Sequence, residues 1–200
     1  MKEIISAIAG LLQIAGFFLY IRAILRKETV PVKASWIIWA SLDTITIAGM
    51  YVKNTVNGQI IGVVLGVWIV LIFALKHGTP DWTKLDKFCF GGAVFGIALW
   101  KIFDNPVLGI VTSLSVLFLG SIPTFVSAWK DSSREDRLAW KIFWASCVCA
   151  VIAIPRWTLA DAAQPIAFFT IDTIMICILF IRPYLLSSGA AVGGARNITP

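Results

Sequence analysis

The sequence predicts an all-α integral membrane protein with seven transmembrane helices, arranged as two parallel three-helix repeats joined by a linker helix. Composition, the spacing of apolar runs and an internal duplication lead to this fold. Of the 200 residues, 58% are hydrophobic and only 14% are charged, and the mean hydropathy is +0.86. A soluble domain of this length is far less apolar. The chain is therefore expected to lie in a lipid bilayer.

Seven apolar runs, each bounded by charged residues, Pro or Gly, are candidates for crossing that bilayer. About 20 residues at 1.5 Å each span the hydrocarbon core, and the shorter runs must include interfacial residues. The predicted spans are 4–21, 36–52, 58–75, 87–103, 106–128, 139–155 and 162–181. The first run lacks a small-residue cleavage site and belongs to the duplication, so we interpret it as a mature helix rather than a signal peptide.

The duplication covers residues 16 to 59, which recur weakly about 104 positions later. At that offset Gly16 matches Gly120 and Trp36 matches Trp140. After one inserted residue the offset becomes 105, and further pairs follow: Trp39 with Trp144, Ser41 with Ser146, Ala48 with Ala153, and Gln59 with Gln164. Duplicated helical units embedded in lipid are typical of carriers whose halves move around a central site.

These repeats divide the chain into four segments. We expect a first three-helix repeat at 1–80, a linker transmembrane helix at 81–104, a second repeat at 105–184, and a disordered cytoplasmic tail at 185–200 that is rich in Gly, Ala and Ser. Because the linker crosses once, both triplets have the same orientation. In the linker, Gly92 and Gly96 form a small-xxx-small pattern, which serves either packing within the monomer or a homo-oligomer contact.

Basic residues are distributed unevenly between the two ends of the predicted helices. The side of the N-terminus carries Lys2, Lys53, Lys101 and Arg156. The opposite side carries thirteen: Arg22, Arg26, Lys27, Lys33, Lys76, Lys84, Lys87, Lys130, Arg134, Arg137, Lys141, Arg182 and Arg196. The positive-inside rule then predicts a multi-pass protein of the plasma (inner) membrane, with its N-terminus outside and its C-terminus in the cytoplasm.

Two acidic residues fall in the middle of predicted spans. Asp43 lies midway between Lys33 and Lys53, and Asp172 lies midway along the last span. A carboxylate at the bilayer centre costs roughly 2.5–3.5 kcal/mol on insertion scales, so each should face the bundle interior, a partner or a water-filled cavity. The alternative is simple burial of a protonated carboxyl that is hydrogen-bonded to Ser, Thr or backbone.

Helical spacing and the repeat add neighbours to these two acids. Aromatic residues beside an acid suit a polar solute with an apolar face, or a cation held by cation–π contact. We expect a substrate-binding site formed by Asp43, Asp172, Trp39, Trp144, Gln13, Thr46 and Phe168. Pro123, inside the fifth span, is the candidate hinge because its missing N–H leaves a carbonyl unpaired.

The three-one-three arrangement, the outside N-terminus, the length and the segment from Pro123 to Trp140 (PTFVSAWKDSSREDRLAW) resemble the SWEET and PQ-loop (MtN3-saliva-like) superfamily of small-solute transporters, and most of all a bacterial branch. In sugar-carrying SWEET proteins the third helix of each repeat presents an Asn to a central pocket flanked by Trp. Here Asp172 stands near that depth in one repeat and Val67 in the other, which favours a cation or proton coupling over a sugar.

We therefore expect a small polar solute transporter that works by alternating access on a sugar or another small metabolite, with proton coupling left open. Its expected partners are the solute and the lipid bilayer; no nucleic acid, cofactor, metal or catalytic residue is expected, and the protein is not expected to be an enzyme. A non-transporting membrane scaffold or sensor is the main alternative. An intramembrane aspartyl protease is a minor one, because neither Asp is next to a Gly as in the Gly-x-Gly-Asp pattern of presenilin-like enzymes.

Overall fold

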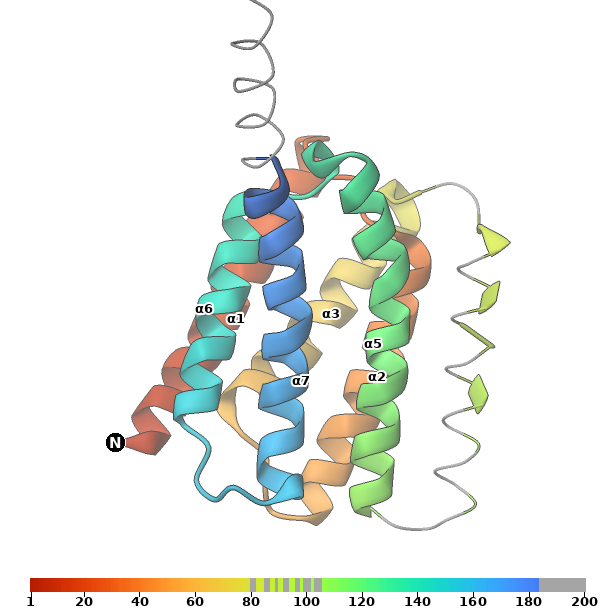
Figure 1. Cartoon of the computed structure of the whole chain (residues 1–200). Helices are drawn as coiled ribbons and strands as arrows, with labels where there is room; N and C mark the ends of the chain where they lie inside the picture. Colours follow the sequence, from red (N-terminus) through yellow and green to blue (C-terminus); the bar gives the residue numbers. More distant parts are fainter. Residues whose placement is uncertain are drawn as a thin grey trace, which may run out of the picture.

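The computed structural model describes residues 1–79, 82–84, 87, 88, 90, 91, 94, 95, 98, 102 and 106–183. Six α-helices form a bundle in this part of the chain (Figure 1), and no strand occurs among its residues. They are α1 (Lys2–Leu25), α2 (Lys33–Val52), α3 (Gly58–His77), α5 (Pro106–Lys130), α6 (Arg137–Ile152) and α7 (Leu159–Ile176). A 3₁₀ turn, η1 (Ser132–Arg134), precedes α6, and a π-helical turn, η2 (Cys177–Ile181), continues α7.

The predicted all-α fold is confirmed for these six helices, whose ends lie close to those of the predicted spans when η2 is counted with α7. The predicted linker helix at 81–104, with Gly92 and Gly96, falls largely outside the described residues, and so does the tail at 185–200. The count of seven helices therefore stays a prediction.

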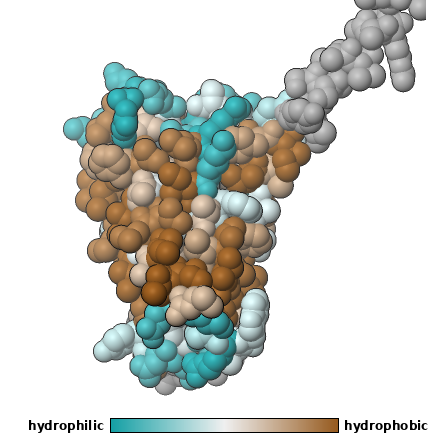
Figure 2. Space-filling model, turned by 90° about the vertical axis from the view of Figure 1, so that its left-hand side faces the viewer, coloured by the Kyte–Doolittle hydropathy of each residue, from teal (hydrophilic) through white to brown (hydrophobic). Residues whose placement is uncertain are grey.

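Among the described residues, four helical segments are long and apolar enough to cross a membrane: Lys2–Leu25, Gly58–His77, Ile110–Lys130 and Leu159–Ile181. The middle helices of the two repeats, α2 and α6, are not among them; α6 has only 16 residues. Figure 2 shows a broad hydrophobic zone across the middle of the face it presents, with hydrophilic residues gathered at the two ends of the bundle. These features indicate a membrane protein, because lipid tails leave apolar side chains on the outside of a bundle.

Helix packing follows the same pattern in both halves of the described bundle. In the first half (α1–α3), α3 packs against both α1 and α2; in the second half (α5–α7), α7 packs against both α5 and α6. Between the halves, α1 packs on α6, and α5 packs on α2. Exchanging the two halves leaves this list of contacts unchanged, which is the arrangement that a duplicated unit produces.

One pair of glycines makes the same contact in both halves. A Cβ on Gly16 of α1 would lie 2.5 Å from the Phe143 ring of α6, and a Cβ on Gly120 of α5 would lie 2.5 Å from Ile38 of α2. Gly16 and Gly120 are repeat partners, and at the offset of 105 so are Ile38 and Phe143. Small residues thus let the halves approach closely at two equivalent places.

Two helices end on residues in the left-handed conformation. Lys27 (φ 61°) follows α1 and Asn54 (φ 54°) follows α2. In each case the next N–H bonds back to the helix, from Glu28 to the Ala23 carbonyl and from Thr55 to the Met50 carbonyl, both at 2.9 Å. This pattern satisfies the free carbonyls at a helix C-terminus and turns the chain toward the next helix.

Candidate functional site

A cavity of about 60 Å³ lies between the two halves of the bundle. Each of the six helices contributes to its wall, and most of the wall is aromatic or aliphatic. Its lining residues are Gln13 and Phe17 from α1, Trp36, Trp39 and Asp43 from α2, Val63 and Val67 from α3, Leu117 from α5, Trp140 and Phe143 from α6, and Phe168, Ile171 and Asp172 from α7. We call it the central cavity.

Two carboxylates face the central cavity from opposite halves. Asp43 is 2% exposed and Asp172 is 9% exposed. The Cys147 thiol donates a hydrogen bond to Asp172 Oδ2 at 3.1 Å. Asp43 Oδ1 and Gln13 Oε1 are buried without a hydrogen-bond partner among the described residues. Because buried polar atoms are normally paired, these two acceptors are places for water or a ligand.

The aromatic part of the wall is continuous across the halves. The rings of Trp36 and Trp39 meet edge to face with centroids 4.9 Å apart, and Phe17 meets Phe143 at 4.9 Å. Trp39 Nε1 donates to Ser121 Oγ of α5 at 3.2 Å. Its N–H therefore points away from the cavity, and the indole face remains as the lining.

Side-chain amides lie beyond one end of the cavity, the end at which α1 begins. Gln164 Nε2 donates to Gln59 Oε1 at 3.0 Å, and Asn57 Nδ2 donates to Gln164 Oε1 at 2.7 Å. Gln59 Nε2 donates to Ser146 Oγ at 3.3 Å and to the Cys147 sulfur at 3.1 Å. We call Asn57, Gln59 and Gln164 the glutamine cluster. The hydrogen bonds of these three residues join the two halves. Gln59 and Gln164 are themselves repeat partners.

A second cavity, of about 500 Å³, lies beyond the glutamine cluster. It is formed by the start of α1, the loop between α2 and α3, and the loop between α6 and α7. Asn57 belongs both to its lining and to the glutamine cluster, and the ion pair between Arg156 and Asp161 (3.2 Å) stands in its wall. The glutamine cluster thus separates this outer cavity from the central one.

Glu135 lies beyond the opposite end of the central cavity, next to the lining residue Trp140. It lies in the loop between η1 and α6, is 4% exposed, and accepts hydrogen bonds from Tyr20 Oη and Trp140 Nε1, both at 2.9 Å. Burial raises the pKa of Glu135 to about 7, against the opposing effect of these two hydrogen bonds. Tyr20 comes from the first half and Trp140 from the second. We call these three residues the Glu135 cluster.

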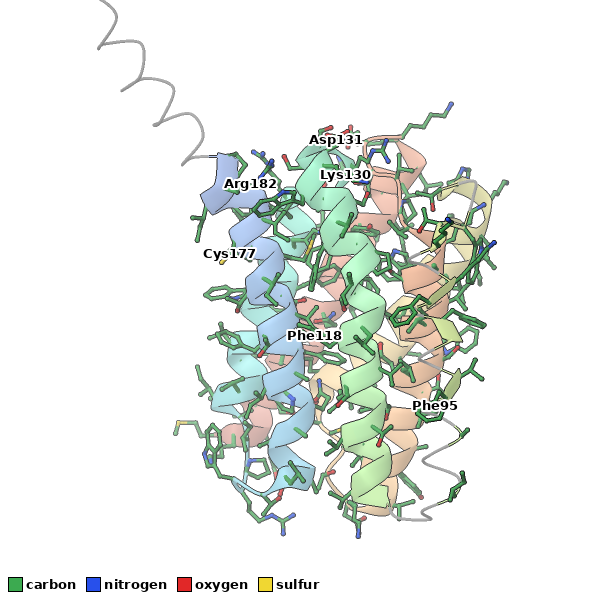
Figure 3. The ribbon with its side chains drawn as sticks, turned by 45° about the vertical axis from the view of Figure 1, so that its right-hand side comes forward. Phe95, Phe118, Lys130, Asp131, Cys177 and Arg182 are labelled. Atoms are coloured by element: carbon green, nitrogen blue, oxygen red, sulfur yellow. The ribbon has the colours of Figure 1, made fainter. Side chains whose placement is uncertain are left out.

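The loops at this end are also joined through the backbone, where Val30 N–H donates to the Arg134 carbonyl at 3.1 Å. Figure 3 shows Lys130, Asp131 and Arg182 together at this end of the bundle. The Arg182 guanidinium lies 4.4 Å from the centre of the Trp129 ring. Hydrogen bonds from the Ser133 hydroxyl and N–H lower the pKa of Asp131, so that carboxylate stays charged beside its basic neighbours.

Five of the seven residues predicted for the site line the central cavity: Asp43, Asp172, Trp39, Gln13 and Phe168. The other two do not. Thr46 is buried in α2, and its hydroxyl lacks a hydrogen-bond partner in the described part of the chain. Trp144 donates to Thr173 Oγ1 at 3.0 Å and packs on Phe169. Pro123, the predicted hinge, lies inside α5.

The structure adds lining residues that the sequence interpretation missed, chiefly Trp140, Phe143 and Phe17. The sequence could have predicted Trp140 as a lining residue, because Trp140 is the repeat partner of Trp36, which shares a helix face with Asp43. The sequence could also have predicted a contact between Gln59 and Gln164, since these two residues are partners in the duplication. Within the described residues, no group of three or more His, Cys, Asp or Glu side chains lies close enough to hold a metal ion.

No protein-family model, no curated protein and no solved structure matches this chain.

Proposed function

We propose that the protein is an alternating-access carrier for a small polar solute, spanning the plasma (inner) membrane with its N-terminus outside and its C-terminus in the cytoplasm. One observation carries the proposal. The cavity lined by Asp43 and Asp172 lies between the two halves, and hydrogen bonds join those halves beyond each of its ends. Such an arrangement suits a carrier whose halves rock around a central site.

The size of the central cavity supports this proposal. About 60 Å³ is room for a few water molecules, whereas a site that encloses a larger organic ligand has several hundred Å³. A metabolite therefore enters only if one end opens and the halves separate. A few hydrogen bonds join the halves at each end, and these can exchange for bonds to water when that end opens while the other stays shut.

The two ends of the bundle match the outer and the cytoplasmic side of a membrane in their expected roles. Opening the glutamine cluster would connect the central cavity to the outer cavity of about 500 Å³. Opening the Glu135 cluster would connect it to the end that carries Lys130 and Arg182, which the positive-inside rule assigns to the cytoplasm. Pro123 interrupts the hydrogen bonds of α5 and supplies a place for that helix to bend. The two halves make matching helix contacts, as expected for the two three-helix repeats of the SWEET and PQ-loop superfamily, which the sequence resembles.

Flux measured in proteoliposomes tests the proposal. The full chain would be reconstituted with a mixture of labelled neutral, anionic and cationic metabolites, and uptake would be compared with that of protein-free liposomes. The variant Val67→Phe, which fills the central cavity from α3, should abolish uptake. The control Leu65→Phe adds the same ring on an exposed position of α3 and should preserve uptake.

Two results would contradict the carrier proposal and favour another function. A folded protein that passes none of these solutes would favour a membrane scaffold or sensor. Cleavage of a transmembrane peptide, lost in Asp43→Asn, would favour an intramembrane aspartyl protease, because two carboxylates that face one cavity are also what such an enzyme needs.

A further inference from the structure

The central cavity is lined by two carboxyl groups and by no basic side chain. Of its thirteen lining residues, Asp43 and Asp172 are the two with an ionisable side chain. The ion pairs in the described part of the chain lie elsewhere, between Arg134 and Asp131 and between Arg156 and Asp161. Two carboxylates that share a dry site disfavour each other's charge. A cation between them would relieve this cost.

The same cavity offers buried hydrogen-bond acceptors that have no partner in the described part of the chain. Asp43 Oδ1 and Gln13 Oε1 are unpartnered among the described residues, although their side chains belong to residues only 2% and 6% exposed. The indole N–H groups of Trp39 and Trp140 donate to Ser121 and Glu135 instead of into the cavity. A ligand that brings its own donors would therefore satisfy these acceptors. An anion finds no charge partner here.

The walls around these acceptors are aromatic. Trp36, Trp39 and Trp140 line the cavity with Phe17, Phe143 and Phe168. Aromatic faces attract cations and also pack well against the apolar body of an amine. The two carboxyl groups, the unpaired acceptors and the aromatic lining residues all favour a ligand that has both an ammonium group and an apolar part.

We infer that the central cavity binds an organic cation with at least one N–H donor, its ammonium group between Asp43, Asp172 and Gln13 and its apolar part against the tryptophans. Such a cation would be the solute of the proposed carrier, and only its transport rests on that proposal. A neutral sugar fits less well, because it would leave both carboxylates without a counter-charge.

Binding to the purified full chain tests the inference without any transport step. The probes are tyramine, its neutral alcohol analogue tyrosol, the N-trimethyl derivative of tyramine, and glucose. Because charge-assisted hydrogen bonds contribute more than neutral ones, tyramine should bind about tenfold or more tighter than tyrosol. The trimethyl derivative, which lacks an N–H, should bind more weakly than tyramine, and glucose should bind weakest.

Variants link the preference to the named residues. Asp43→Asn and Asp172→Asn should each remove most of the preference for tyramine over tyrosol. The control Asp131→Asn neutralises an exposed carboxylate in a loop and should keep it. If the aspartate variants do not fold, Gln13→Leu serves instead: it should weaken tyramine binding and leave tyrosol unchanged. A preference that survives in the variants, or equal binding of tyrosol or glucose, overturns the inference.

Uptake of the same probes into proteoliposomes separates the two proposals. If tyramine binds as expected and no solute crosses the membrane, the cation site stands and the carrier proposal fails. If glucose or an anion crosses and tyramine neither binds nor crosses, the carrier proposal stands and the cation site fails.

Discussion

Replacing Glu135 by Gln should make the protein more stable above neutral pH and leave it unchanged in acid. The carboxyl is 4% exposed, and its burial raises the pKa from 4.5 to about 7. The buried site therefore favours the protonated form. A glutamine side chain has nearly the shape of that form, and its carbonyl oxygen would still accept the hydrogen bonds of Tyr20 and Trp140.

The sign and the magnitude follow from the two pKa values. Folding holds a proton on Glu135 that the unfolded chain releases near pH 4.5. This contribution to stability is complete below about pH 4.5 and is lost as the pH rises through about 7. Since one pKa unit corresponds to about 1.36 kcal/mol, the loss amounts to about 3 kcal/mol, which the Gln variant avoids.

Thermal unfolding of the purified chain in detergent, measured from pH 4.5 to 8.5, would show this difference. The two melting temperatures should coincide near pH 4.5 and then separate, with the variant melting higher by several degrees at pH 8.5. Asp131→Asn is the control, because Asp131 is an exposed carboxylate close to Glu135 in the sequence, and its pKa is lowered instead. A variant that is less stable at pH 8.5 would refute the reasoning, since it would show that the charged carboxylate strengthens the cluster.

Three further predictions concern the helices. Gly62→Ala should cost about 1–3 kcal/mol of stability in detergent unfolding, because its Cβ would lie 2.7 Å from a backbone carbonyl of α1, whereas Gly91→Ala meets nothing within 4 Å and should be neutral. Lys27→Gly should raise the unfolding free energy by about 1 kcal/mol by relieving a positive φ, while Lys53→Gly, at φ −91°, should lower it. Pro123→Ala should leave solute binding unchanged and slow uptake into proteoliposomes, because it restores a hydrogen bond in α5.

Each of these has a result that contradicts it. Equal melting temperatures for the two glycine variants would mean that α1 and α3 do not cross as closely as the structure has them. A destabilising Lys27→Gly would place that residue outside the left-handed region. Unchanged uptake in the proline variant would remove Pro123 as the hinge.

The helices could be predicted from the sequence because their signal is local. A run of about 20 apolar residues crosses lipid as a helix whatever its neighbours are, since no water is present to pair its backbone groups. Prediction of the midplane acids used the same argument, and Asp43 and Asp172 do line one cavity. The duplication also identified Gln59 and Gln164 as partners before any contact between them was known.

The side-chain detail of the site was harder to predict, as Trp140 and Trp144 illustrate. The repeat offered both, and the sequence interpretation selected Trp144, yet Trp140 lines the cavity and Trp144 bonds to Thr173. The two residues are four positions apart, about one helical turn, so depth along α6 and rotation about its axis decide between them. Both depend on how α1 and α7 pack against α6, which no local pattern encodes.

The burial of Glu135 was even harder to predict from the sequence. In the sequence it is one acidic residue in a charged loop, and nothing nearby marks it as buried. Its partner Tyr20 lies 115 positions away.

By itself, then, the sequence determined that this chain forms apolar helices, that two of its segments resemble each other, and that each half carries an acid midway along a helix. These properties depend only on hydrophobic length, composition and repetition along the chain. Only the tertiary structure decided that both acids share one small cavity, that two buried acceptors there have no partner among the described residues, and that Tyr20, Glu135 and Trp140 join the halves beyond one end while amides join them beyond the other. Such contacts join helices from different halves, so they exist only once the packing has fixed how each helix is placed and turned.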